Sequence, residues 1–114
     1  MVYRRHEWTA KNSAVITPTS LHYPLAESLA NVDDLGRRDD FPLKNFRVEN
    51  KSGVNITLII DPIGGDGELK FIIPDGQTIA SNPNDDFTFH NLLVKNDGLL
   101  DIPINNIITN VRNY

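Results

Sequence analysis

From Lys44 to the end of the chain, apolar and polar residues alternate in short runs. Alternation with a period of two places every second side chain on one face of a strand, as in a half-buried β-sheet. Strands are therefore expected in seven runs, at residues 46–49, 54–60, 68–73, 77–80, 87–94, 99–104 and 106–112.

Turn-forming residues separate these runs. Pro74-Asp75-Gly76 predicts a tight turn in which Pro74 sets φ at the first corner and Gly76 supplies a positive φ. Asn96-Asp97-Gly98 predicts a hairpin between two strands. The stretch Gly64–Gly67 predicts a hairpin loop, because a phosphate-binding loop would lead through Lys and Ser or Thr into a helix, whereas Glu68 enters a strand.

Six or seven short strands with no helix between them indicate an all-β fold, a small antiparallel β-sandwich over residues 44–114. The apolar side chains of the alternating runs are expected to form its core. They are Phe46, Val48, Ile56, Leu58, Leu69, Phe71, Phe87 and Phe89.

Residues 1–43 lack this alternation and predict an extended N-terminal arm that contains one short helix. Pro24 suits the first turn of that helix and Gly36 its end. One apolar stripe runs along it, formed by Leu21, Leu25, Leu29 and Val32. A lone helix this short is marginal in water, so its stripe has to pack against another surface.

Two surfaces are open to the arm, its own sandwich or a neighbouring subunit, and we favour the subunit. The residues expected to contact that partner are large apolar or cationic residues of the arm. They are Tyr3, Arg4, Arg5, Trp8, Leu21, Leu25 and Leu29. On this hypothesis, deletion of residues 1–40 should leave a folded β-domain that no longer joins its assembly.

Composition and charge limit the kinds of partner that this chain is expected to bind. The net charge is −4 and the carboxylates are spread along the chain, so no nucleic-acid partner is expected. The absence of cysteine removes disulfides and thiolate ligands, and it favours a cytoplasmic origin. No apolar run approaches the roughly 20 residues of a membrane helix, and the N-terminus lacks the apolar core of a secretory signal. No membrane partner is expected.

Residues that carry chemistry are scattered along the chain. His6, His22 and His90 have no second histidine at ligand spacing. Catalysis needs titratable groups collected in a cleft, so we expect no enzymatic activity, no cofactor and no metal. The rival hypothesis is a free-standing β-module that binds a sugar or calcium. The loop carboxylates available for calcium are Asp61, Asp66, Asp75, Asp85 and Asp86.

Three stretches, Phe46–Asn50, Val54–Asp61 and Phe71–Gly76, resemble the small β-domains of virion structural proteins of tailed bacteriophages. The first reads as a strand that ends in Asn, the second as an alternating strand that ends in Asp, and the third as a Phe-x-Ile-Pro-x-Gly turn. The resemblance implies a non-enzymatic role as a capsid decoration protein or a head–tail component. It also implies synthesis in the host cytoplasm and incorporation into the virion. The partners would be other virion proteins or copies of this chain, in a large homo- or hetero-oligomeric assembly.

Overall fold

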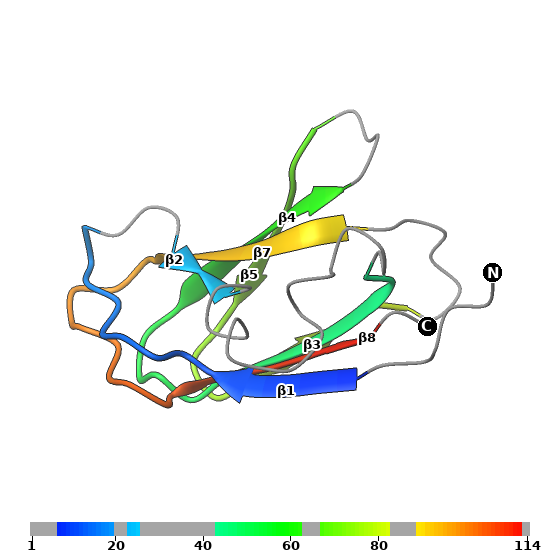
Figure 1. The fold of residues 1–114 in the computed structure, drawn as a ribbon. Helices are drawn as coiled ribbons and strands as arrows, with labels where there is room; N and C mark the ends of the chain where they lie inside the picture. Colours follow the sequence, from blue (N-terminus) through cyan, green and yellow to red (C-terminus); the bar gives the residue numbers. More distant parts are fainter. Residues whose placement is uncertain (1–6, 20–22, 26–42, 63–66, 83–88, 113–114) are drawn as a thin grey trace, which may run out of the picture.

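The computed structural model describes residues 7–19, 23–25, 43–62, 67–82 and 89–112, and these residues form two four-stranded antiparallel sheets (Figure 1). The strands are β1 (Glu7–Lys11), β2 (Tyr23–Pro24), β3 (Asn45–Asn50), β4 (Ile56–Pro62), β5 (Leu69–Ile73), β6 (Thr78–Ala80), β7 (Phe89–Asn96) and β8 (Ile107–Arg112). One sheet has the order β1-β8-β3-β6 and the other the order β2-β7-β4-β5. The predicted all-β sandwich is confirmed.

The strand pairings are nested. β1 pairs with β8, β2 with β7, β3 with β6 and β4 with β5, as in one long hairpin whose turn lies between β4 and β5. Two further pairings, β3 with β8 and β4 with β7, fold this ribbon into two sheets. Consecutive strands therefore lie in different sheets, except for β4 and β5. Eight strands in this order form a jelly roll.

The core lies between the two sheets. On β1, β8 and β3, the register places Trp8, Val111 and Phe46 in one cross-strand row, and all three are buried. The Phe46 ring meets the Phe89 ring of the opposite sheet edge-to-face, with centroids 5.9 Å apart. Alternating side chains from both sheets thus interdigitate, as expected for an aligned sandwich.

The predicted core is confirmed at Phe46, Val48, Ile56, Leu58 and Phe89, which are all buried. Leu69 was predicted wrongly, because 38% of it is exposed.

Phe71 is half-buried, and Phe87 lies outside the described residues. Leu69 and Phe71 both belong to β5, which pairs with β4 alone among the described strands. The inward-facing side chains of an edge strand have neighbours within the sheet on one side only, so they are covered less completely.

The turn before β6 forms one residue later than predicted. The Gln77 amide donates to the Pro74 carbonyl at 3.1 Å, so Asp75 and Gly76 are the corner residues and Pro74 precedes them. Gly76 has a φ of 79°, which confirms the predicted positive φ. The connection between β4 and β5 joins adjacent antiparallel strands, which confirms the predicted hairpin.

The predicted hairpin at Asn96-Asp97-Gly98 is wrong, because β7 and β8 lie in different sheets. Gly98 is needed for a different reason, since a Cβ atom on it would lie 2.5 Å from the Val54 Cβ. The strand predicted over 99–104 is also absent, and of these residues only Ile102 forms a β-bridge, with Ile16.

The described part of residues 1–43 belongs to the sandwich. β1 and β2 are edge strands of the two sheets, and Trp8, Ile16 and Leu25 join the common core. The arm could pack on its own sandwich or on a neighbouring subunit, and its described residues pack on their own sandwich. Pro24 lies in β2 and Leu25 has a helical backbone conformation, and the remainder of the predicted helix, residues 26–36, lies outside the described residues.

Candidate protein-interaction surface

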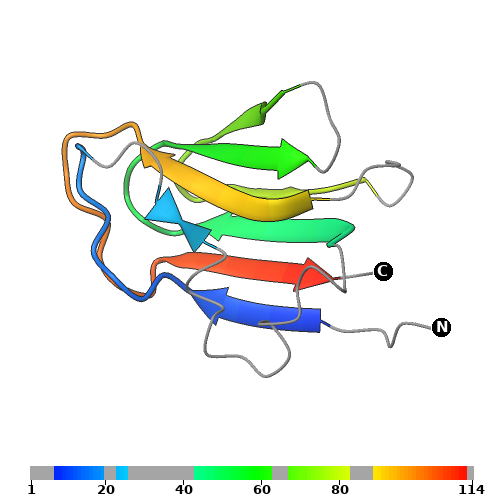
Figure 2. The ribbon, with the colours of Figure 1, turned by 45° about the horizontal axis from the view of Figure 1, so that its top comes forward.

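Two connections lie side by side at one end of the sandwich, the β1–β2 connection at residues 12–19 and the β7–β8 connection at residues 97–106 (Figures 1 and 2). We call them the paired loops. Their backbones are joined by a reciprocal pair of hydrogen bonds, from the Ile16 amide to the Ile102 carbonyl at 3.0 Å and from the Ile102 amide to the Ile16 carbonyl at 2.9 Å. The Asn105 amide adds a bond to the Asn12 carbonyl at 3.0 Å. The two loops therefore form one ordered unit.

The fully buried side chain of Asn12 fastens this unit to the sheet. Its Nδ2 donates to the carbonyls of Ala14 and Pro103, each at 2.9 Å. Its Oδ1 accepts from the amides of Asn106 at 3.0 Å and Ile107 at 2.9 Å. One side chain thus satisfies four backbone groups from both loops, and a fully satisfied buried polar group rigidifies its surroundings.

Asn96 has the same role at the end of β7. Its buried Nδ2 donates to the carbonyls of Ile16 at 3.0 Å and Leu100 at 2.8 Å. Its Oδ1 accepts from the Gly98 amide at 2.8 Å. Asn12, directly after β1, and Asn96, the last residue of β7, therefore hold the paired loops together from two different places in the chain.

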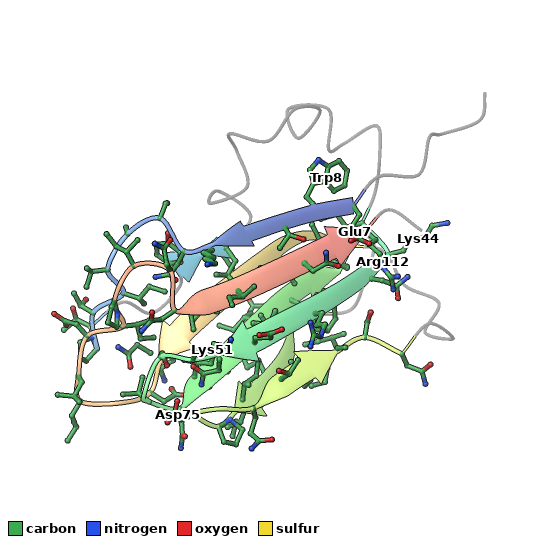
Figure 3. All side chains as sticks on the ribbon, turned by 90° about the horizontal axis from the view of Figure 1, so that it is seen from below. Glu7, Trp8, Lys44, Lys51, Asp75 and Arg112 are labelled. Atoms are coloured by element: carbon green, nitrogen blue, oxygen red, sulfur yellow. The ribbon has the colours of Figure 1, made fainter. Side chains whose placement is uncertain are left out.

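A third buried asparagine, Asn50, braces the β3–β4 and β5–β6 connections. Its Nδ2 donates to the carbonyls of Val54 at 2.8 Å and Ile73 at 2.9 Å. These connections carry Lys51 and Asp75, which lie at the same end as the paired loops, whereas Lys44 and Arg112 lie at the other end (Figure 3). Asparagine side chains thus organise this whole end of the sandwich.

The paired loops expose large aliphatic side chains although their backbones are held firmly. The exposed fractions are 95% for Leu99, 69% for Leu100, 49% for Ile104 and 46% for Val15. The charged residues in these loops are Asp97 and Asp101. Protein interfaces are depleted of charge at their centres, and exposed apolar patches mark places where other proteins bind. The paired loops are therefore the candidate functional surface.

Two of the partner-contacting residues predicted from the sequence, Trp8 and Leu25, are described, and neither lies on the paired loops. Trp8 and Leu25 are 3% and 0% exposed and lie in the core of their own chain, rather than on a surface that a partner could contact. Tyr3, Arg4, Arg5, Leu21 and Leu29 lie outside the described residues.

Sequence reasoning missed the apolar loop residues because Leu99 and Leu100 were assigned to a strand. A usable signal was present, since two adjacent leucines follow a turn and stand before the charged Asp101. Alternation would instead have placed a polar residue at one of the two positions.

A hollow of about 270 Å³ lies on the outer face of β1, β8 and β3. Its lining consists of Glu7, Thr9, Arg47, Glu49, Ile108 and Asn110. Several of its polar groups already pair with one another. The Arg47 Nη1 lies 2.8 Å from the Glu49 Oε1, and the Asn110 Nδ2 donates to the Thr9 Oγ1 at 2.8 Å. These pairs are typical of a solvated sheet face.

In the part of the chain that the structure describes, no three His, Cys, Asp or Glu side chains gather as metal ligands. Of the loop carboxylates considered for calcium, Asp75 is the one whose side chain is described, and it accepts a hydrogen bond from the Gly53 amide at 2.8 Å. The described residues also contain no helix of the length and apolar composition that a membrane crossing needs.

Comparison with protein families, with curated proteins and with solved structures finds no match to this chain. The fold is therefore identified from its strand order, and the candidate surface from the exposure and hydrogen bonds of its residues.

Proposed function

We propose that this protein is a non-enzymatic structural component of a tailed-phage virion, such as a capsid decoration protein or a head–tail component. In this proposal it binds neighbouring subunits of the particle through the paired loops. The observation that carries the proposal is the exposure of Leu99, Leu100, Ile104 and Val15 on loops that buried asparagines hold in place.

The energetics of such a surface favour binding to another protein. Full burial of a Leu side chain contributes roughly 1.5–3 kcal/mol, so Leu99 and Leu100 together offer several kcal/mol. Because the loops are already hydrogen-bonded to each other and to the sheet, little conformational entropy remains to be lost on binding. A preorganised apolar loop surface therefore suits a stable place in an assembly.

The fold and the sequence resemblance support the same proposal by analogy. Jelly rolls occur in viral capsid proteins, and they also occur in lectins and cupins. A fold does not determine a function, so the exposed loop residues remain the main support. The stretches that resemble virion proteins of tailed phages coincide with β3, β4 and the β5–β6 turn.

Trp8 and Leu25 lie in the core of their own chain. In this proposal the paired loops, rather than these two residues, contact the neighbouring subunits. Contacts through Tyr3, Arg4, Arg5, Leu21 and Leu29 remain a prediction.

The test compares the wild-type chain with a Leu99→Asp, Leu100→Asp double variant in the phage or cell that produces it. Particles are purified by density-gradient centrifugation, and the chain is quantified in the particle fraction by mass spectrometry. Both leucines are exposed, so the variant should keep its fold and its melting temperature. A matched control is Gln77→Asp, an exposed position on the β5–β6 turn at the same end of the sandwich.

We expect the wild type and the Gln77→Asp control to sediment with particles and the double leucine variant to remain in the soluble fraction. The proposal fails if the wild-type chain is absent from particles. It also fails if the double variant is incorporated as well as the wild type, or if the chain is a monomer that binds a sugar or calcium.

A further inference from the structure

β5 is the outer strand of its sheet, and one of its backbone edges pairs with no other strand in the described part of the chain. It pairs with β4 on one side, and no hydrogen bond joins its other side to any described residue. A row of unpaired amides and carbonyls is a template for another strand. In the described part of the chain, β5 is longer than the edge strands β2 and β6.

Apolar side chains of β5 are exposed on both faces of the sheet at this edge. On the outer face, Ile72 is 70% exposed. On the inner face, Phe71 is half-buried and Leu69 is 38% exposed, so the core is incompletely closed at this edge. The one charged residue within β5 is Lys70. Addition of a strand would cover apolar surface and satisfy backbone groups at once.

We propose that two copies of this chain pair antiparallel through β5, about a twofold axis at Phe71. This pairing joins their two β2-β7-β4-β5 sheets into one continuous sheet. A twofold axis of this kind gives a closed, self-complementary interface. The inference concerns a different surface from the paired loops and stands independently of the proposed function.

The charge pattern selects this register. Centred on Phe71, Leu69 of each copy faces Ile73 of the other, and Lys70 faces Ile72, so all five residues of β5 are paired and no like charges meet. A shift by one residue would mix core-facing with outward-facing side chains, because the side-chain period is two.

The alternative registers are less favourable. Centred on Lys70, the two ammonium groups would face each other. Centred on Leu69, the pairing would have to include Gly67, which has a φ of 139°, outside β5. Centred on Ile72, it would include Pro74, which has no amide to donate.

A pairing of five residues per chain is small for a protein interface. Interfaces that bury less than about 1,200 Å² are typically weak and transient. The dimer is therefore expected to be concentration-dependent in solution, and more populated where an assembly raises the local concentration.

Sedimentation velocity over a concentration series tests the pairing with two opposite charge substitutions at one position. Ile72→Lys would place a second ammonium group opposite Lys70 twice per dimer, whereas Ile72→Glu would place a carboxylate there twice. Ile72 is mostly exposed, so both variants should fold as monomers. We expect Ile72→Lys to weaken the dimer by at least about tenfold and Ile72→Glu to retain it.

The contrast between the two variants excludes a general apolar contact. If Ile72→Lys and Ile72→Glu weaken self-association equally, the proposed pairing is overturned, because only the Lys70–Ile72 register distinguishes the two charges. A wild-type chain that stays monomeric up to millimolar concentration also overturns it.

Disulfide trapping tests the register directly, and the chain contains no cysteine that would interfere. Opposite residues of antiparallel strands have Cα atoms about 4.5–5.5 Å apart, within the range of a disulfide. Under oxidation, a mixture of the Lys70→Cys and Ile72→Cys variants should form a cross-linked dimer, and neither variant alone should do so. Efficient cross-linking of Lys70→Cys alone, or no cross-linking in the mixture, rules out the Phe71-centred register.

Discussion

β3 and β4 lie in the interior of the two sheets, whereas β1 and β2 lie at their edges. β4 contributes three buried inward-facing residues, Ile56, Leu58 and Ile60. β1 contributes one large buried side chain, Trp8, and β2 is two residues long. The central strands thus carry a long apolar pattern, and the edge strands a short one.

The difference between central and edge strands shows that a strand with a short alternating pattern can still contribute to the core. Trp8 lies in one row with Val111 and Phe46, and the connection after β1 buries Ile16 completely. An edge strand needs few inward residues because it covers only the margin of the core. Its effect on stability depends on the surface that it closes, not on how many residues alternate.

The largest expected effect tests whether the edge strands are dispensable. Deletion of residues 1–40 removes Trp8, Ile16 and Leu25, which together contribute roughly 4.5–9 kcal/mol of burial. The total stability of a domain is about 5–15 kcal/mol, so we expect the truncated chain to lose its cooperative thermal transition by circular dichroism. This expectation reverses the one based on sequence alone. A truncated chain that melts as sharply as the full one would show β1 and β2 to be appendages.

The next effect compares an edge residue with a central one in the same row. Trp8→Ala and Phe46→Ala should each lower the free energy of unfolding by about 3–5 kcal/mol in urea titrations, because both side chains are buried. Lys11→Ala is the control on β1, where an exposed side chain should change stability by less than about 0.5 kcal/mol. If Trp8→Ala costs no more than Lys11→Ala while Phe46→Ala is severe, the edge strand does not contribute to the core as described.

The smallest effect concerns the loop end. Asn12→Ala leaves four backbone groups, each buried or partly buried, without their partner and should cost about 1–3 kcal/mol. Asn110→Ala removes one side-chain hydrogen bond to Thr9 and should cost about 0.5–1.5 kcal/mol. Hydrogen exchange of the Asn106 and Ile107 amides should rise sharply in the Asn12 variant. Equal losses in the two variants would mean that Asn12 does not hold the paired loops.

Much of the local structure follows from the sequence. Alternation predicts β3, β4, β5 and β7 because successive side chains of a strand point to opposite faces of the sheet. The pattern can therefore be read from residues that are neighbours in the sequence. Gly76 predicts its turn because few residues other than glycine adopt a positive φ easily. β1 was also within reach, since Glu7-Trp8-Thr9-Ala10-Lys11 alternates, but five residues with one large apolar side chain are a weak signal.

The candidate surface was less predictable. The sequence favoured Trp8 as a contact because no core is visible around it along the chain, and Leu25 because it belongs to the apolar stripe of a helix too short to be stable alone. Their neighbours come instead from β8, β3 and other distant segments that share the core. Two adjacent leucines break the alternation of a strand, but their exposure follows from the position of their loop at the end of the sandwich.

The sequence by itself determined the β-type of the chain, most strand positions and the residues available for the core. Only the tertiary structure decided which strands are neighbours, which strands lie at the edges and which apolar side chains remain exposed. The physical reason is the range of the interactions. Alternation and turn propensity act between adjacent residues, whereas the nested pairing joins segments such as Thr9 and Asn110, which are 101 residues apart. Burial of the core between two sheets selects such pairings only when the whole chain is folded.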